Sequence, residues 1–296
     1  MPSIAGYVKK AEKQGKRFAQ VVLESQAADL ESTPEALLAK MRQALTVMEE
    51  SAKEGEDPSL RSASGLTGGA AAKVMARARA GESLCGEFFG KAVARALAVS
   101  ECNACMGRIV AAPTAGSCGI LPAALLTVME EKGLPEEGAV MGLFTAAGVG
   151  MVIASNATVS GAQGGCQAEV GSASAMAAAA VVEMMGGTPQ MCADACAIAL
   201  KNVLGLVCDP VAGLVEVPCV KRNAMGVVNA LAAAEIALAG VSSAIPADEV
   251  IVAMKKVGNV MPGILRETAE GGLADTPTGR RIAEAFLRGG SQAASE

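Results

Sequence analysis

The stretch SAMAAAAVVEMMGG, residues 174–187, consists almost entirely of small and apolar residues. Alanine is the strongest helix former, and side chains this short let neighbouring helices approach closely. Elsewhere, alternating patterns and β-branched or aromatic runs are scarce, whereas Ala, Leu and Met dominate. The sequence therefore predicts an all-α fold, in which a single glycine- and alanine-rich helical domain packs around a central buried element.

Four helix starts are marked along the chain. At each one a capping hydroxyl or a proline precedes apolar residues at helical spacing, where the first-turn amides of a helix lack partners. These starts are Thr33-Pro34, Thr188-Pro189, Pro246 and Thr276-Pro277.

The composition divides the chain into three parts. Residues 1–60 are the more charged and predict an N-terminal amphipathic helical region. The stretch SASGLTGG at 62–69 predicts a loop that joins this region to an apolar body at 61–289. Residues 290–296 are expected to form a flexible tail.

Charge and composition exclude several classes of function. The net charge of -5, without a basic stripe, gives no electrostatic attraction to nucleic acid. The N-terminus lacks the apolar core of a secretory signal, so we expect a cytoplasmic protein. The apolar stretch at 138–154 has the length of a buried core helix and is short for a membrane span, so no membrane is expected. The absence of histidine excludes serine-type triads and histidine-ligated zinc.

Nine cysteines in a reducing compartment are expected to be thiols or metal ligands rather than disulfides. Cys102 and Cys105 have the spacing of a redox or metal pair. No second pair and no βαβ pattern accompanies them, which favours ordinary helix packing. Cys192 and Cys196 lie four residues apart on a predicted helix and indicate core packing, and Cys85 is expected in a loop or at a helix end.

Cys166, Cys208 and Cys219 differ, because each lies in a segment that helices disfavour: GAQGGCQAEVGS, GLVCDPVAG and VEVPCVKRN. Glycine permits close approach to a ligand, and proline interrupts the helix beside two of the thiols. This local pattern leaves two interpretations open, a metal or cluster site and a set of buried structural thiols. Three thiolates on a cubane cluster would leave one iron without a protein ligand, and such an iron is a Lewis acid rather than a simple electron carrier.

The cysteine segments belong to longer stretches that resemble a known family. The similarity extends from about residue 60 to residue 281, with a weaker SGLTGG element at 64–69. The stretches are NACMGRIVAAPTAGSCGILPAALL (103–126), SNATVSGAQGGCQAEVGSASAMAAAA (155–180), LKNVLGLVCDPVAGLVEVPCVKRNA (200–224), IPADEVIVAMKKVG (245–258) and LRETAEGGLADTPTGRR (265–281). Together they are similar to the iron–sulfur-dependent L-serine dehydratases, and specifically to the separate alpha chain of the two-chain bacterial type.

The resemblance implies a 4Fe-4S cluster held in loops between helices by Cys166, Cys208 and Cys219, with one iron not ligated by cysteine. It implies that the body at 61–289 is the catalytic domain and converts L-serine to pyruvate and ammonia without pyridoxal phosphate. Cys118, in PTAGSCG, is expected not to be a fourth ligand, because a fourth thiolate would close the open site. The resemblance also implies that in some members a C-terminal cysteine of the protein itself caps the open iron. The stretch GGSQAASE at 289–296 has no cysteine, so such a cap is not expected here.

The general base is not identified by the sequence. The family's two-chain members carry a beta subunit, and we hypothesise that this partner supplies the base or closes the site. For the substrate's charged groups, the loops PTAGS and SNATVSG and the residues beside Cys219 offer candidates, each of which could instead be a helix cap, a buried turn or a counter-charge. The candidates are Thr114, Ser117, Asn156, Ser160, Lys221 and Arg222.

Other functions remain open at this point. A cysteine desulfidase would need nearly the same cluster site, because only the leaving group differs. A non-catalytic electron-transfer subunit would need a fourth cysteine ligand, for which Cys118 is the candidate. A pyridoxal-phosphate enzyme is disfavoured, because Lys201 and Lys221 lack the strand-rich setting of a Schiff-base lysine. A helical membrane or assembly subunit is a further alternative.

Overall fold

The structure is a computed structural model that describes residues 2–293, with side chains to residue 288. Every regular element in this part of the chain is helical, and the only strand-like pairing in it is one isolated bridge between Cys208 and Arg266. The predicted all-α fold is confirmed.

The N-terminal helices are α1 (Ile4–Gln14), α2 (Phe18–Asp29) and α3 (Pro34–Gly55). The middle of the chain forms α4 (Ala70–Arg79), α5 (Gly86–Ala104), α6 (Ile120–Lys132), α7 (Glu136–Asn156) and the short α8 (Gly161–Gly164). The remaining helices are α9 (Ser172–Met184), α10 (Pro189–Lys201), α11 (Cys219–Leu238), α12 (Ala247–Val260) and α13 (Pro277–Ala293). Residues 290–293 of the predicted tail thus close α13, and residues 294–296 lie outside the described part.

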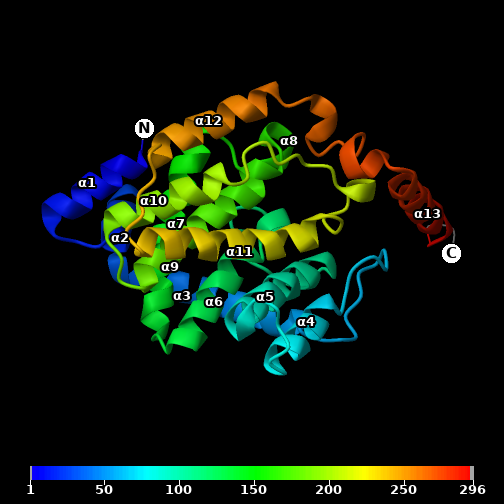
Figure 1. Ribbon diagram of the computed structural model, residues 1–296, viewed down its shortest axis with the longest axis horizontal. Helices are drawn as coiled ribbons and strands as arrows, with labels where there is room; N and C mark the ends of the chain where they lie inside the picture. The colour runs from blue at the N-terminus through cyan, green and yellow to red at the C-terminus, as the bar shows by residue number, and fades with distance from the viewer. Residues whose placement is uncertain (1, 294–296) are drawn as a thin grey trace.

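Helix α9 is the centre of the molecule. Each of its residues, Ser172 to Met184, is buried. It packs against α6, α7, α10 and α11, which gather around it in Figure 1. Because ten of its thirteen residues are Ala, Ser or Val, neighbouring helices can approach on every side. This helix is the central buried element that the alanine-rich stretch predicts.

The four predicted helix starts are confirmed at α3, α10, α12 and α13. Thr33 accepts a hydrogen bond from the first turn of α3, and Thr188 does the same for α10, each at 3.2 Å. The Thr276 hydroxyl accepts one from Gly279 at 3.0 Å at the start of α13. The caps and prolines that the sequence predicts therefore begin these helices in the structure as well.

Helices α1 to α3 pack on the body of the molecule. Arg17, between α1 and α2, forms an ion pair at 2.7 Å with the buried carboxylate of Glu183 in α9. Asp248 in α12 accepts a hydrogen bond at 2.8 Å from the backbone amide of Ile4 in α1. Phe18 is fully buried in the same hydrophobic core as α9. The more charged N-terminal region thus shares one core with the apolar body.

Helix α7 has the length and the composition of a membrane-crossing helix, and 61% of its most apolar window is buried inside the protein. It packs against α9, α2 and α3. Its apolar surface is thus largely covered by the protein itself, as expected of a core helix.

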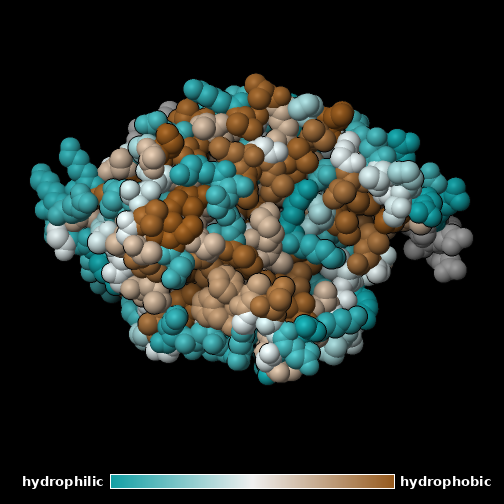
Figure 2. Space-filling view, viewed as in Figure 1, coloured by the Kyte–Doolittle hydropathy of each residue, from teal (hydrophilic) through white to brown (hydrophobic). Residues whose placement is uncertain are grey.

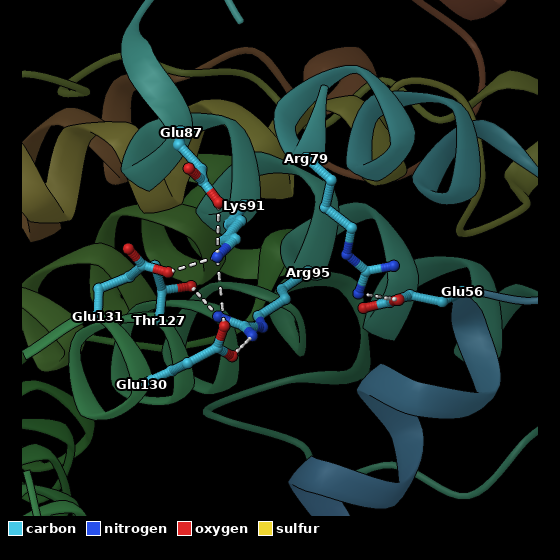
Figure 3. A network of polar contacts seen from close by, with 8 residues as sticks. All are labelled: Glu56, Arg79, Glu87, Lys91, Arg95, Thr127, Glu130 and Glu131. Atoms are coloured by element: carbon cyan, nitrogen blue, oxygen red, sulfur yellow. Dashed lines mark hydrogen bonds and ion pairs between the residues drawn. The ribbon is translucent and has the colours of Figure 1, made fainter. Parts of the chain in front are cut away.

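A polar network fixes the first half of α5 to the end of α6. Figure 3 shows Lys91 pointing between three carboxylates, with Arg95 beside it. The Lys91 Nζ atom lies 2.6 Å from Glu131 and 2.9 Å from Glu87. Hydrogen bonds to these carboxylates raise the pKa of Lys91 above its usual value. Because the Lys91 side chain is only 14% exposed, the network is screened less than an ordinary surface pair.

Glycine determines how closely α3 approaches α5. A Cβ atom at Gly55 would overlap the backbone carbonyl of Ala98. We expect Gly55→Ala to lower the free energy of unfolding by about 3 kcal/mol, because backbone cannot move aside as a side chain can. Urea unfolding monitored by circular dichroism measures this. Gly138→Ala, in α7 with open space around it, should instead raise stability by about 0.5–1 kcal/mol; equal losses in both variants would contradict the packing argument.

Candidate functional site

Cys166, Cys208 and Cys219 come from three separate breaks between helices. Cys166 follows Gly165, whose φ of 75° belongs to the left-handed region, and precedes a π-helical turn at Gln167–Gly171. Cys208 lies in the connection between α10 and α11, and Cys219 is the first residue of α11. Cys166 is in this way brought to one end of α9 and α11 together with Cys208 and Cys219, which follow it by more than forty positions.

Electrostatics place the three thiols in one neighbourhood. Burial raises the pKa of Cys166 to about 11 and that of Cys219 to about 12, and Cys166 and Glu169 raise the latter further. Burial, and after it Cys166 and Glu169, raises the pKa of Cys208 well above its usual range. All three are free thiols. A metal-free site of this kind is thus protonated, and a metal would have to displace the protons.

The thiol set suits a cluster better than a single ion. Among residues 2–288, no three Cys, Asp or Glu side chains lie close enough to hold one metal ion, which would need its sulfurs within about 4 Å of one another. A multi-iron cluster is wider, and each thiolate binds a different iron. Two buried thiols and the partly buried Cys219, with the Arg222 guanidinium beside Cys166, are the residues that could hold such a group.

Arg222, in the first turn of α11, connects the cysteine segments. Its guanidinium donates hydrogen bonds to the backbone carbonyl of Val207 and to the Asp209 carboxylate, both at 2.8 Å. It also hydrogen-bonds the Cys166 sulfur and lowers the pKa of that thiol, against the larger effect of burial. The Arg222 guanidinium is therefore already paired, and it serves as a positive charge beside the cysteines. Lys221, its neighbour, is exposed.

Glu169 lies among the thiols, and sequence reasoning missed it. Its carboxylate accepts a hydrogen bond from Thr114 at 2.6 Å and lies 3.8 Å from the Cys208 sulfur. Burial raises its pKa, against the opposing effect of the Thr114 hydrogen bond. The available signal was its place three residues after Cys166 in GGCQAEVG, since residues three apart share one face of a helical turn.

Glycine makes room for this carboxylate. A Cβ atom at Gly161 would lie against the Glu169 carboxylate and 3.0 Å from the Cys208 sulfur, and one at Gly116 would lie 3.2 Å from Glu169. The PTAGS and SNATVSG loops thus approach Glu169 through their glycines. Ser160 precedes Gly161 at this edge of the site, and its carbonyl accepts hydrogen bonds from the first turn of α8.

The other loop candidates fall into two groups, those that lie beside Glu169 and one that lies away from it. Ser117 is buried, and its hydroxyl lies 3.2 Å from that of Thr114, so both belong to the polar group around Glu169. The Asn156 amide instead donates to the backbone carbonyls of Pro2 and Val152, at 3.0 and 2.8 Å, and closes the end of α7. The structure thus brings Thr114 and Ser117 together with the cysteines and uses Asn156 elsewhere.

Cys118 follows directly on Ser117. Its thiol is fully buried and donates toward the backbone carbonyl of Val99 at 3.9 Å. Burial raises its pKa to about 12, and the neighbouring Cys102 and Cys219 contribute. It is therefore near Cys219 but engaged with α5.

The remaining cysteines match their predicted settings. Cys192 and Cys196 are buried in α10, Cys85 is exposed at the start of α5, and Cys102 and Cys105 close its end.

Asn223 joins the PTAGSCG loop to the start of α11. Its buried amide donates to the carbonyls of Gly116 and Cys219, at 2.8 and 2.9 Å, and accepts from the amide of Gly119 at 2.9 Å. One side chain therefore holds the Thr114 loop beside Cys219. This role was invisible in the sequence, because two of its three partners, Gly116 and Gly119, are backbone atoms more than a hundred residues away.

A C-terminal segment runs along the Cys208 loop. Cys208 donates its amide to the carbonyl of Leu265 at 2.9 Å, and its carbonyl accepts from the amide of Glu267 at 2.7 Å. Asp209 then accepts a hydrogen bond from the amide of Leu273 at 2.8 Å. Residues 263–275, between α12 and α13 in Figure 1, thus form a strap against the site.

Comparison with known proteins gives the context of this site. The family model described as serine dehydratase alpha chain matches residues 13–274. The chain is 54% identical to a probable L-serine dehydratase, alpha chain, of Bacillus subtilis, over 92% of this chain and 90% of that protein. It is 48% identical to the L-serine dehydratase, alpha chain, of Peptoniphilus asaccharolyticus, over 93% of this chain and 94% of that one. It is also 48% identical to an L-serine dehydratase of Streptomyces coelicolor, over 60% of this chain and 40% of that protein.

Replacing Asn223 tests the junction. We expect Asn223→Ala to lower the free energy of unfolding by about 2–4 kcal/mol, because it leaves buried backbone groups without partners. Denaturant unfolding of the metal-free protein measures the loss. Asn103→Ala is the matched control, because Asn103 reaches the same loop only through a 3.4 Å hydrogen bond to Ala115 and should lose no more than about 0.5 kcal/mol. A similar loss in both variants would argue against the assigned role.

Proposed function

The chain belongs to the serine dehydratase alpha-chain family, and on that premise we propose that it converts L-serine to pyruvate and ammonia together with a beta subunit. We further propose that Cys166, Cys208 and Cys219 hold a 4Fe-4S cluster. The observation that carries this proposal is the convergence of three free thiols, two of them buried and that of Cys219 partly buried, from three helix breaks around Arg222.

The elimination breaks two bonds, between Cβ and the hydroxyl oxygen and between Cα and its proton, and neither breaks readily. Hydroxide is a poor leaving group, and the α-proton of serine is weakly acidic. Cys166, Cys208 and Cys219 would hold a cluster whose iron without a cysteine ligand would supply Lewis-acid chemistry toward the substrate hydroxyl. The product of elimination, an enamine, tautomerises and hydrolyses to pyruvate and ammonia without further help from the protein.

The chain's own residues prepare the site for this chemistry. Arg222 places one positive charge against the thiolates and holds two cysteine segments in register. Thr114 presents its hydroxyl beside Glu169, where it can bind a polar group of the substrate, and the buried Ser117 hydroxyl lies against it. Burial of Glu169 beneath the glycines of two loops keeps bulk water away from the carboxylate.

A partner subunit is supported by three observations. The family and two relatives are named alpha chains. The relative from Streptomyces coelicolor aligns over only 40% of its length, so that protein contains a large region outside the match. The surface also has a groove of about 500 Å³ beside α11, lined by Val93, Val203, Met225 and Val228, and Figure 2 shows hydrophobic surface across the face where α11 lies. Such patches are typical of protein interfaces.

The cluster assignment is tested by anaerobic reconstitution with iron and sulfide. We expect about four irons per chain in the wild type, and loss of the visible absorbance in Cys166→Ala, Cys208→Ala and Cys219→Ala. Cys118→Ala and Cys196→Ala are the controls and should keep their iron. Full iron content in any of the first three variants, or its loss in Cys118→Ala, would contradict the ligand set.

The partner assignment is tested by a pyruvate assay on the reconstituted chain, alone and with the beta chain. We expect full turnover of L-serine only in the mixture, because this chain has no histidine and needs a base or a closed site from its partner. Full turnover by the chain alone would overturn this assignment. Release of sulfide from L-cysteine without pyruvate from L-serine would point to a desulfidase instead.

A further inference from the structure

The strap at residues 263–275 brings a carboxylate to the cysteines. The hydrogen bonds of Cys208 to Leu265 and Glu267 fix the backbone of Glu267 directly beside a thiol of the site. Glu267 has a φ of 63°, in the left-handed region that residues with a side chain rarely adopt. Such strained residues gather at functional sites, where the surrounding structure holds them in place.

The Glu267 side chain lies near the site and is unpaired among the described residues. Its charge is close enough to raise the pKa of both Cys208 and Glu169, in each case after the larger effect of burial. Among residues 2–288, its carboxylate has no hydrogen-bond or ion-pair partner, and the residue is exposed. A rim carboxylate without a partner in the protein is available to a ligand.

The other carboxylates around the site are already engaged. Asp209 accepts hydrogen bonds from Arg222 and from the backbone of Leu273. Glu216, two residues before Pro218, accepts hydrogen bonds from Ser62 and Ser64 at 2.7 and 2.8 Å. Glu169 accepts from Thr114. Among these four carboxylates, Glu267 is the one that accepts no hydrogen bond and forms no ion pair within residues 2–288.

We propose that Glu267 binds the α-ammonium group of the amino-acid substrate. The inference rests on the proposed function, and it names the residue that distinguishes an amino acid from a plain hydroxy acid at this site. An ammonium entering between Glu267 and Glu169 relieves the repulsion between two like charges and makes a charge-assisted hydrogen bond. The hydroxyl of the substrate then lies toward the three cysteines, and its carboxylate lies toward the Thr114 loop.

Glu169 is the alternative partner for the ammonium, and the structure favours Glu267. The Glu169 carboxylate lies beneath Gly161 and Gly116 and already accepts a hydrogen bond, so an ammonium bound there would lose most of its water. At the exposed Glu267 it keeps part of its hydration shell. The strap also fixes the position of Glu267, because hydrogen bonds between backbone atoms hold it beside Cys208.

The test uses the reconstituted alpha–beta complex with Glu267→Gln, and Glu270→Gln as the matched control from the same strap. We expect Glu267→Gln to raise the KM for L-serine about tenfold or more, with a much smaller change in kcat, because a charged hydrogen bond to the bound substrate is lost. Inhibition by 3-hydroxypropanoate, which lacks the amino group, should stay within about twofold of wild type. Glu267→Asp should restore part of the affinity for serine.

A second readout does not depend on turnover. Equilibrium binding of L-alanine, which has the ammonium but no leaving group, should weaken about tenfold in Glu267→Gln and remain unchanged in Glu270→Gln. Rate constants are taken per cluster, so altered iron loading does not bias them.

The outcomes separate the two proposals. An unchanged KM in Glu267→Gln, or equal weakening of L-serine and 3-hydroxypropanoate, would overturn the ammonium site while the dehydratase assignment stands. A wild-type complex that neither binds nor converts L-serine would overturn both.

Discussion

The burial of α9 on all sides is the constraint on which the rest of the structure depends. A helix covered completely by other helices must have side chains short enough for close approach, and its few polar groups need internal partners. Ser174 accordingly donates to the backbone carbonyl of Gly226, and Glu183 is paired with Arg17. Because Cys166 and Glu169 lie in the turns that lead directly into this helix, their depth in the protein is set by the same packing.

The site is built where helices stop rather than within them. Glycine and proline interrupt the chain beside each cysteine, and the free ends are then tied together by side chains that look ordinary in the sequence. Asn223 and Arg222, both in the first turn of α11, hold the Thr114 loop and the Cys208 loop respectively. A rigid helix terminus therefore positions flexible connections, which gives a reactive centre more definition than loops alone provide.

Negative charge dominates this part of the molecule. Burial raises the pKa of Cys208, Cys219 and Glu169, and the neighbouring acidic groups raise it further: Glu169 acts on both thiols, and Glu267 acts on Cys208 and Glu169. Such an arrangement is costly for ionised groups unless cations enter, and it suits both a cluster of metal ions and a substrate that carries an ammonium group. Burial, and after it this repulsion, keeps the thiols protonated and therefore unreactive in the absence of a metal.

The sequence by itself determined the all-α class, four helix starts and the three cysteines that differ from the other six, because these depend on local propensity and on residues a few positions apart. Only the tertiary structure decided which polar residues share the site. Asn156 lies in a motif of the family yet caps α7, whereas Glu169, Asn223 and Glu267 become neighbours of the cysteines. Their partners are backbone atoms and thiols from distant segments, and no local pattern encodes such contacts. Packing around α9 creates them.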